Sequence, residues 1–233
     1  MFRALFKRGV KKQKRPVWIR ILRYVLFIHL WFWGIVASLS LLFNFVNPPY
    51  TPLMAHRLIV RSYPIHKRYF IALKAMPRST KAMILTLEDG NYYQHWGFDW
   101  KMIREARERN RKAGRIRFGG STISNQLART VFLTTHGNYF RKYLEAQVTV
   151  IMEICLSKNR MLELYLNYVE WGKGIYGIDS AARHYYGRSA KNLSREQLMQ
   201  LMAVLTNPLD YTPQTYYRSP SASQRYQTLQ RYH

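Results

Sequence analysis

Residues 24–46 read YVLFIHLWFWGIVASLSLLFNFV, and this stretch decides how the rest of the chain is arranged. A helix of this length extends about 35 Å, enough to cross a hydrocarbon core of about 30 Å. Its all-round apolarity and the aromatic run Trp31–Trp33 argue against a buried core helix. A cleaved signal peptide would be shorter, and no small-residue cleavage site follows Val46. The stretch therefore predicts a single transmembrane helix.

The residues before this helix carry only positive charge. Lysine and arginine that flank a membrane helix stay on the cytoplasmic side. We therefore expect residues 1–23 in the cytoplasm, a single pass through the cell inner membrane, and everything after about Asn47 outside. The basic residues before the helix are Arg3, Lys7, Arg8, Lys11, Lys12, Lys14, Arg15, Arg20 and Arg23.

The whole chain has a net charge of +25, from 37 lysines and arginines against 12 aspartates and glutamates. No acidic residue precedes Glu88. Strongly basic chains have two usual partners, nucleic acid and anionic lipid. A domain outside the cytoplasm does not meet nucleic acid, so we expect membrane phospholipid as the partner of the basic surface. Cys155 is the only cysteine, which excludes an intramolecular disulfide.

Downstream of the membrane helix the pattern is mainly helical. Residues 47–70 open with a proline-rich break and continue as a basic, aromatic stretch of weak periodicity, which predicts a juxtamembrane linker. Residues 71–233 are expected to form one mainly α domain. Apolar residues recur at helical spacing from Val148 to Cys155, and Ser194–Gln197 is a capping box that predicts another helix start.

Carboxylates are scarce, so the position of each is informative. Glu88 and Asp89 end a helical pattern, where the negative end of the helix dipole makes a carboxylate hold a proton more readily, as a general base must. The alternative is an exposed helix end with two solvated acids. Glu145 shares a helical face with apolar residues, which costs free energy unless the acid is paired or lines a cleft. The alternative is a surface ion pair with Arg141, one turn earlier.

Gly119-Gly120-Ser121-Thr122 precedes a helical run from about Ile123 to Phe132. A glycine-rich turn that leads into a helix offers free N–H groups and a positive dipole end, which suits an anion. Many ordinary loops share this composition, so the tetrapeptide alone is a weak signal. The basic residues near it in sequence, which could neutralise a diphosphate, are Arg115, Arg117, Arg129, Arg141 and Lys142.

Taken together, four segments resemble, in order and spacing, the motifs of the family 51 peptidoglycan glycosyltransferases. The similarity covers about residues 70 to 215. The segments are EDGNYYQHWGFDW (88–100), GGSTISNQLART (119–130), RKYLE (141–145) and RMLELYLNYVEWGKGIYGI (160–178). Those most similar to the monofunctional members of the family are QHWGFDW (94–100), AARHYYG (181–187) and NPLDYTP (207–213).

The resemblance implies a lysozyme-like, mainly α glycosyltransferase domain whose cleft opens near the membrane. It also implies a reaction in which the donor is a growing glycan on undecaprenyl diphosphate and the acceptor is the 4-hydroxyl of lipid II. The β-1,4 bond forms with inversion, and undecaprenyl diphosphate is released. No organic cofactor is implied, although a divalent metal such as Mg or Mn could accompany the substrate diphosphate at Glu145. Cell-wall synthesis or division proteins are further candidate partners.

The resemblance also implies a role for individual residues. By motif position, Glu88 corresponds to the general base that deprotonates the acceptor hydroxyl. Glu145 corresponds to a second glutamate that assists departure of the diphosphate, and Glu163 to a glutamate with a structural role. The residues that correspond to substrate contacts, or support them, are Asp89, His95, Ser121, Thr122, Gln126, Arg129, Arg141 and Lys142.

Three positions depart from the usual pattern of the family. Asn125 replaces a frequent Gln, and Thr130 replaces a frequent Asn. Gly137 stands where an Arg usually helps to clamp the diphosphate, so we expect His136 or a nearby Arg to take over that contact.

No Ser-x-x-Lys motif occurs in the sequence, so we expect polymerisation without transpeptidase crosslinking. Two other classes of protein fit part of the pattern. A lysozyme-like lytic enzyme would also place glutamates in a helical cleft, but the membrane helix and the basic glycine-rich segment favour a lipid-diphosphate donor. A non-enzymatic basic membrane scaffold would explain the charge and leave the four ordered segments without a reason.

Overall fold

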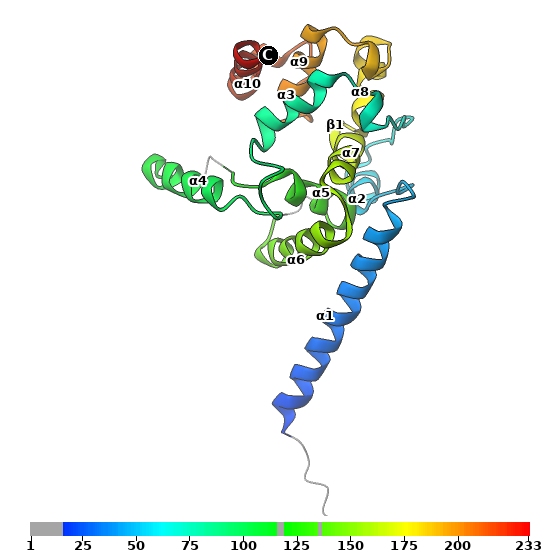
Figure 1. The fold of residues 1–233 in the computed structure, drawn as a ribbon, viewed down its shortest axis with the longest axis vertical. Helices are drawn as coiled ribbons and strands as arrows, with labels where there is room; N and C mark the ends of the chain where they lie inside the picture. Colours follow the sequence, from blue (N-terminus) through cyan, green and yellow to red (C-terminus); the bar gives the residue numbers. More distant parts are fainter. Residues whose placement is uncertain (1–15, 116–118, 135–136) are drawn as a thin grey trace, which may run out of the picture.

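A computed structural model of the chain describes residues 16–115, 119–134 and 137–233. Figure 1 shows a helical domain with one long helix projecting from it, which confirms the mainly α fold with a single N-terminal apolar helix. The elements are α1 (Val17–Leu42), α2 (Pro52–Arg61), η1 (Leu73–Ala75), α3 (Arg78–Glu88), α4 (Trp100–Ala113), α5 (Ile123–Phe132), α6 (Tyr139–Cys155), α7 (Lys158–Tyr168), β1 (Glu170–Gly172), β2 (Ile175–Tyr176), α8 (Ile178–Tyr186), η2 (Ala190–Asn192), α9 (Arg195–Val204), η3 (Tyr216–Arg218) and α10 (Pro220–Tyr232).

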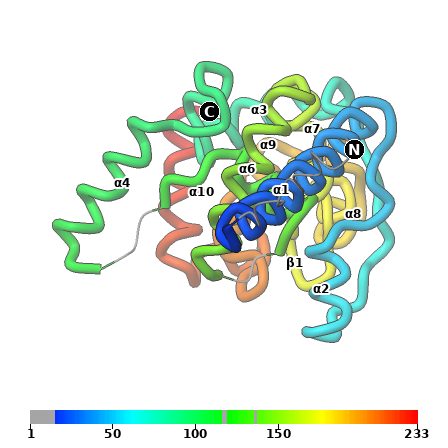
Figure 2. Tube along the Cα trace, turned by 90° about the horizontal axis from the view of Figure 1, so that it is seen from below, coloured from blue at the N-terminus to red at the C-terminus, as the bar shows by residue number. Residues whose placement is uncertain are grey.

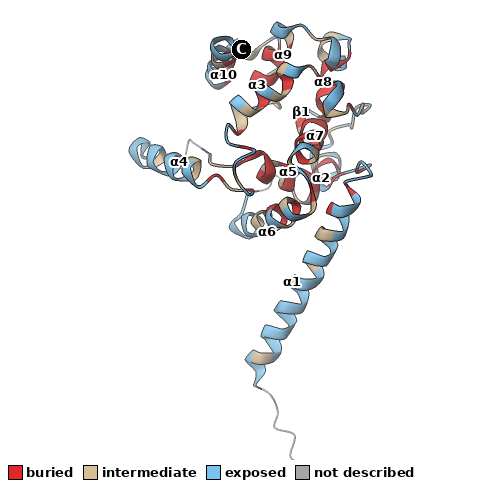
Figure 3. Cartoon of the chain, viewed as in Figure 1, coloured by how far each residue is buried: buried red, intermediate tan, exposed pale blue. Residues whose placement is uncertain are grey.

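The helices form two packed groups. At the end from which α1 projects, α5 packs on α6 and α7, and α6 also packs on α1. At the opposite end, α3, α9 and α10 pack on one another. Buried apolar side chains such as Ile123, Leu127 and Trp171 fill the interior (Figure 3). Helix α4, whose residues are all described, lies outside this core, since Ala106 is its only buried residue.

Helix α1 is long and apolar enough to cross a membrane. It begins at Val17, before the expected first residue Tyr24, and it ends at Leu42, before Val46. Its early end has a local cause, because the Asn44 side chain donates to the carbonyl of Leu41 at 3.2 Å and to that of Cys155 at 2.9 Å. Most of α1 is exposed (Figure 3), unlike the core helix of a soluble domain.

The segment 47–70 is more than the linker that its weak periodicity predicted. Helix α2 lies within it, capped by Thr51 and opened by a proline at the first helical position, a favourable place for that residue. Leu53 and Met54 are buried, and α2 packs on α5. The packed domain therefore starts before the expected boundary at residue 71, because two apolar side chains on a short helix suffice to dock it.

Residues 63–77, which include η1, form a strap that hydrogen-bonds to α7 and α8. The buried Asn167 side chain pairs with the backbone here as a neighbouring β-strand would. It accepts from Ile71 N and donates to Ile71 O, both at 2.9 Å. Glu163 accepts from the backbone N–H of Leu73 at 2.6 Å and pairs with Arg160 at 2.5 Å. These contacts make Glu163 a residue that ties the strap to α7.

Helix α5 starts where the sequence predicts, at Ile123, and a capping box fixes that start. Thr122 Oγ1 accepts from Asn125 N, and the Asn125 side chain accepts from Thr122 N. The capping box predicted at Ser194 and Gln197 likewise opens α9. Local capping chemistry thus sets two of the helices that surround the site.

Candidate active site

Helix α5 presents two partly exposed polar side chains on an otherwise buried surface. Between Ile123 and Val131 every residue is buried except Gln126 and Arg129. These two lie three residues apart, about 4.5 Å along the axis and on neighbouring positions of one face. Each of them contacts one of the two glutamates expected to be catalytic, so α5 brings both glutamates into one site.

Glu88 is the last residue of α3, and its side chain is 12% exposed. Gln126 Nε2 donates to Glu88 Oε2 at 2.8 Å, and Arg225 of α10 pairs with Glu88 Oε1. A carboxylate can accept about four hydrogen bonds, so these two contacts leave lone pairs for an incoming hydroxyl. Glu88 is therefore both held in place and reachable, as a general base must be.

A tyrosine hydroxyl on α7 orients the Gln126 amide. Tyr165 of α7 is fully buried, and its hydroxyl donates to Gln126 Oε1 at 3.1 Å. Burial, followed by the negative charge of Glu88, raises the pKa of Tyr165 well above its usual value, so the hydroxyl stays a donor. Because Gln126 Oε1 accepts from Tyr165, the amide NH₂ is the end that faces Glu88.

Asp89 supports the site and does not face it. This residue is 2% exposed, and its carboxylate accepts from the ring of His95 at 3.0 Å and from the backbone N–H of Ile123 at 3.0 Å. It thereby joins the end of α3 to the start of α5. The resemblance gave Asp89 and His95 as substrate contacts or as support for them. The Asp89 side chain is buried and that of His95 is 8% exposed, and the hydrogen bond between them fits the supporting role.

Thr122 is another predicted substrate residue, and its side chain contacts only other parts of the protein. It is fully buried, and its hydroxyl donates to Gly97 O at 2.7 Å besides capping α5. Gly97 adopts φ +75°, and a Cβ there would lie 2.7 Å from the side chain of Thr149. The positive φ and the nearby Thr149 side chain require glycine at position 97. Complete burial leaves the Thr122 side chain no access to a ligand.

Glu145 lies at the centre of a cationic cluster. Its side chain is 1% exposed, and its two oxygens pair with Arg141 and Lys142, one turn earlier on α6. Arg129 Nη1 of α5 approaches within 4.0 Å, and Lys142 Nζ also reaches Ser121 Oγ at 3.4 Å. Glu145 therefore does pair with Arg141, as the alternative interpretation held, but the pair is buried in a cluster of one acid and three bases.

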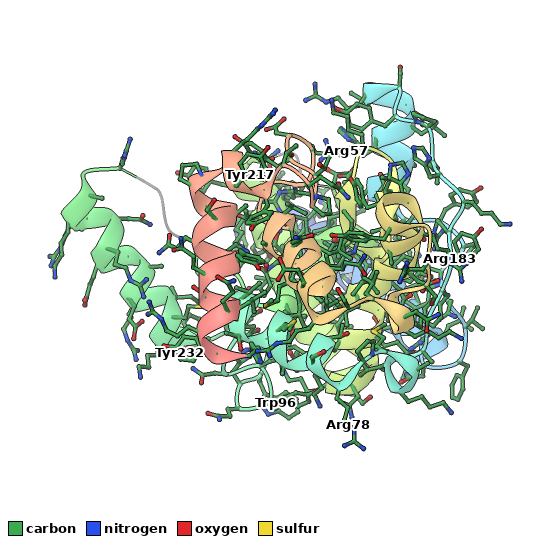
Figure 4. The ribbon with its side chains drawn as sticks, turned by 90° about the horizontal axis from the view of Figure 1, so that it is seen from above. Arg57, Arg78, Trp96, Arg183, Tyr217 and Tyr232 are labelled. Carbon is green, nitrogen blue, oxygen red and sulfur yellow. The ribbon has the colours of Figure 1, made fainter. Side chains whose placement is uncertain are left out.

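Two pockets lie against α4, and each is lined by a cationic partner of one of the glutamates. A pocket of about 580 Å³ is lined by Gly119 and by Arg225, the partner of Glu88. A pocket of about 530 Å³ is lined by Ser121 and by Lys142, the partner of Glu145. Ala106 of α4 lines both pockets. Seen from above, α4 stands apart from the body beyond α10 (Figure 4).

The cluster around Glu145 does not resemble a metal site of the protein itself. Both oxygens of Glu145 pair with cationic side chains, and these repel a divalent ion. Nowhere in the described ranges do three or more His, Cys, Asp or Glu side chains come together in a way that could hold a metal. The donor set suits an anion better than a cation.

Arg225 and the buried hydroxyl of Tyr165 are the contributions to the site that sequence reasoning missed. Arg225 lies 137 positions from Glu88, in a tail where no motif marks it. Gly137, where the family usually has an Arg, is exposed, and its suggested substitute His136 lies outside the described residues. Arg117, one of the basic residues near the glycine-rich turn, also lies outside them.

Comparison with known proteins places most of the chain in one family. The family model described as Transglycosylase matches residues 57–232, which extends past residue 215 and includes α10 with Arg225. A protein of Dechloromonas aromatica (strain RCB) is 42% identical over 186 residues, 78% of this chain and 79% of its own length. One of Pseudomonas fluorescens (strain SBW25) is 42% identical over 182 residues, 76% and 75% of the two chains. One of Nitrosospira multiformis is 37% identical over 203 residues, 85% and 87%. All three are named biosynthetic peptidoglycan transglycosylase.

Proposed function

This chain belongs to the transglycosylase family and is a peptidoglycan glycosyltransferase, and we propose that it polymerises lipid II into β-1,4-linked glycan strands. In the proposed reaction the 4-hydroxyl oxygen of lipid II attacks C1 of the terminal sugar of a growing glycan. The new C1–O4 bond forms with inversion while the bond from C1 to undecaprenyl diphosphate breaks. The diphosphate leaves with the bonding electron pair, and the hydroxyl proton passes to a base.

Glu88 is the proposed base. Its carboxylate keeps lone pairs free beyond the contacts with Gln126 and Arg225, and it is the more accessible of the two glutamates. The chain Tyr165–Gln126–Glu88 fixes where the proton acceptor lies. A base held at a set position loses little entropy when the acceptor hydroxyl arrives.

The cluster around Glu145 is the proposed site of the leaving diphosphate. Arg141, Lys142 and Arg129 carry three positive charges against one negative charge, so the cluster retains a surplus for an anion. Charge-assisted bonds to phosphate oxygens stabilise the charge that develops as the C1–O bond breaks. The role proposed for Glu145 is to hold Arg141 and Lys142 in place and thereby assist departure of the diphosphate.

One observation carries this proposal more than any other. Gln126 and Arg129, neighbours on one face of α5, link the accessible glutamate and the cationic cluster within a single site. The membrane helix adds support, because a substrate with a polyprenyl tail is confined to the membrane. We propose the inner membrane as the location, with the N-terminus in the cytoplasm and the catalytic domain outside. Absence of Ser-x-x-Lys from these 233 residues supports polymerisation without crosslinking.

The test is incubation of the purified full-length protein with labelled lipid II, followed by separation of glycan strands by length. Wild-type protein should produce strands that a muramidase digests, and Glu88→Gln should produce none. Release of short fragments from finished glycan, with no growth from lipid II, would contradict the proposal and favour a lytic enzyme. A reporter fused after His233 tests the topology and should be active only outside the cytoplasm.

A further inference from the structure

One stripe of α1 faces the domain, while the rest of the helix is exposed. His29 and Trp33, one turn apart, begin this stripe, and the buried Val36 and Ser40 continue it. The small side chain of Ser40 lets a neighbouring helix approach closely. A helix that only tethers the protein does not need such a stripe of polar and small residues, because lipid chains form no hydrogen bonds with side chains.

Two side-chain hydrogen bonds connect this stripe to α6. The His29 ring lies 2.9 Å from the hydroxyl of Tyr143, and Trp33 Nε1 donates to Gln147 Oε1 at 2.5 Å. The two residues of each helix are four positions apart, so the bonds are repeated at successive turns. Seen from below (Figure 2), α1 runs across α6.

Glu145 lies between Tyr143 and Gln147 in sequence but on the other side of α6. Two residues correspond to about 200° of helical rotation, so Tyr143 and Gln147 face α1 while Glu145 faces α5. The near-complete burial of Glu145 and its approach to Arg129 of α5 agree with this. Helix α6 is thus packed between α1 and α5, and α1 determines the position of the face opposite the proposed diphosphate site.

Hydrogen bonds on an apolar helix have few competitors. Residues around His29 and Trp33 are apolar and exposed, such as Ile28, Leu30 and Trp31. In a lipid environment a polar group released from its partner finds no water, so the paired arrangement is favoured. The two bonds therefore restrict rotation and sliding of α6 relative to α1.

We propose that α1 is a positioning element of the active site and that Trp33 and His29 hold α6 through Gln147 and Tyr143. In this way the membrane helix sets where Glu145, Arg141 and Lys142 lie. The inference rests on the proposed role of the Glu145 cluster in diphosphate departure. It distinguishes two functions of a membrane helix. A tether raises the local concentration of enzyme and affects the apparent KM, whereas a positioning helix affects kcat.

The first experiment compares matched substitutions on the same helices in the full-length protein. Trp33→Phe and Tyr143→Phe each remove one hydrogen-bonding group, and Trp31→Phe and Tyr139→Phe make the same changes at sites that are 66% and 96% exposed. We expect kcat for lipid II to fall about three- to tenfold in the first pair and to be unchanged in the second. The KM and the membrane-bound fraction should be the same in all four variants.

A double-mutant cycle sharpens this test. Because Trp33 and Gln147 share one bond, Trp33→Phe combined with Gln147→Leu should lower kcat no further than either change alone. Replacement of residues 24–42 by a leucine helix provides a variant that keeps the anchor. Two such variants are compared, one with His29 and Trp33 retained and one without them. Both should bind membranes as wild type does, but only the variant that retains His29 and Trp33 should have the wild-type kcat.

The outcomes separate the inference from the proposed function. No polymerisation by wild-type protein would overturn the proposed function itself. An active wild type with equal kcat in Trp33→Phe and Trp31→Phe, and in the two leucine-helix variants, would overturn the positioning role alone. Loss of membrane association in Trp33→Phe would also contradict it, since the residue would then act in anchoring.

Discussion

The two glutamates of the site carry the same carboxylate but differ in exposure, in the charge around them and in their place in the fold. The Glu88 side chain is 12% exposed and has one cationic and one neutral partner. The Glu145 side chain is 1% exposed and lies among three cations. Glu88 ends a helix in the group of α3, α9 and α10, whereas Glu145 lies within α6, in the group that joins the membrane helix.

This difference is the physical reason for the two proposed roles. With Arg225, Glu88 forms a pair of balanced charge, and it retains access for a neutral hydroxyl whose proton it can accept. The Glu145 cluster has two positive charges in excess, three bases less one acid, which suits the charge of a departing diphosphate. A general base needs access, and a site for a leaving anion needs surplus charge. No single environment provides both.

The largest expected effect comes from removing the base. Glu88→Gln keeps the size of the side chain and its contact with Arg225 but cannot accept a proton. We expect the rate of strand formation to fall about 10²- to 10⁴-fold, the usual contribution of a general base. Thermal unfolding should change little. Near-normal turnover in this variant would show that the proton goes elsewhere, and Asp89→Asn would then be the next variant to measure.

Glu145→Gln should reduce turnover by about 10²-fold, comparable to losing one well-placed donor at a developing charge. Arg141 and Lys142 lose the acid that orients them, and the buried cluster also becomes less stable. Steady-state kinetics with and without added Mg or Mn tests at the same time whether a metal accompanies the diphosphate. A wild-type rate under both conditions would reduce Glu145 to a structural ion-pair partner.

Arg225→Gln should have a smaller effect, about tenfold on kcat, because the base remains and only its orientation and counter-ion are lost. Arg231→Gln is the matched control on the same helix, at an exposed position. Equal rates in the two variants would mean that the contact between α10 and Glu88 does not matter to the reaction.

The smallest expected effect is on thermal stability and concerns α4, the helix that lines both pockets. The N–H of Met102, followed by the amide of Asn91, lowers the pKa of Asp99, the N-cap of α4. Because the pKa is lowered, the ionised cap stabilises the fold fully at pH values above the usual pKa of 3.8. This contribution to stability is lost as the pH falls from 3.8 through the lowered pKa. Asp99→Asn keeps a capping oxygen and should flatten the dependence of Tm on pH below about 4. A wild-type slope in this variant would assign the acid sensitivity to another group.

The sequence predicted those parts of the molecule that depend on local chemistry. The glycine-rich turn located the start of α5 and a capping box that of α9, and the apolar stripe of α6 put Glu145 on the same face as the buried Val148 and Met152. The resemblance to known motifs then identified both glutamates. The sequence could not predict contacts between distant segments, such as Arg225 with Glu88 or His29 with Tyr143, because a local pattern does not show which distant residue will pack against it. The burial of the Thr122 and Asp89 side chains likewise results from tertiary packing, which no local pattern shows.

The division between the two glutamate environments is tested most directly by the binding of polyprenyl diphosphate, the proposed leaving group. Its Kd would be measured in detergent micelles for full-length wild type, Arg141→Gln, Lys142→Gln and Arg225→Gln. We expect each substitution in the Glu145 cluster to weaken binding about tenfold or more, as for loss of a charge-assisted bond, and Arg225→Gln to leave it unchanged. An equal loss in all three variants, or a loss confined to Arg225→Gln, would contradict the assignment of the diphosphate to the Glu145 cluster.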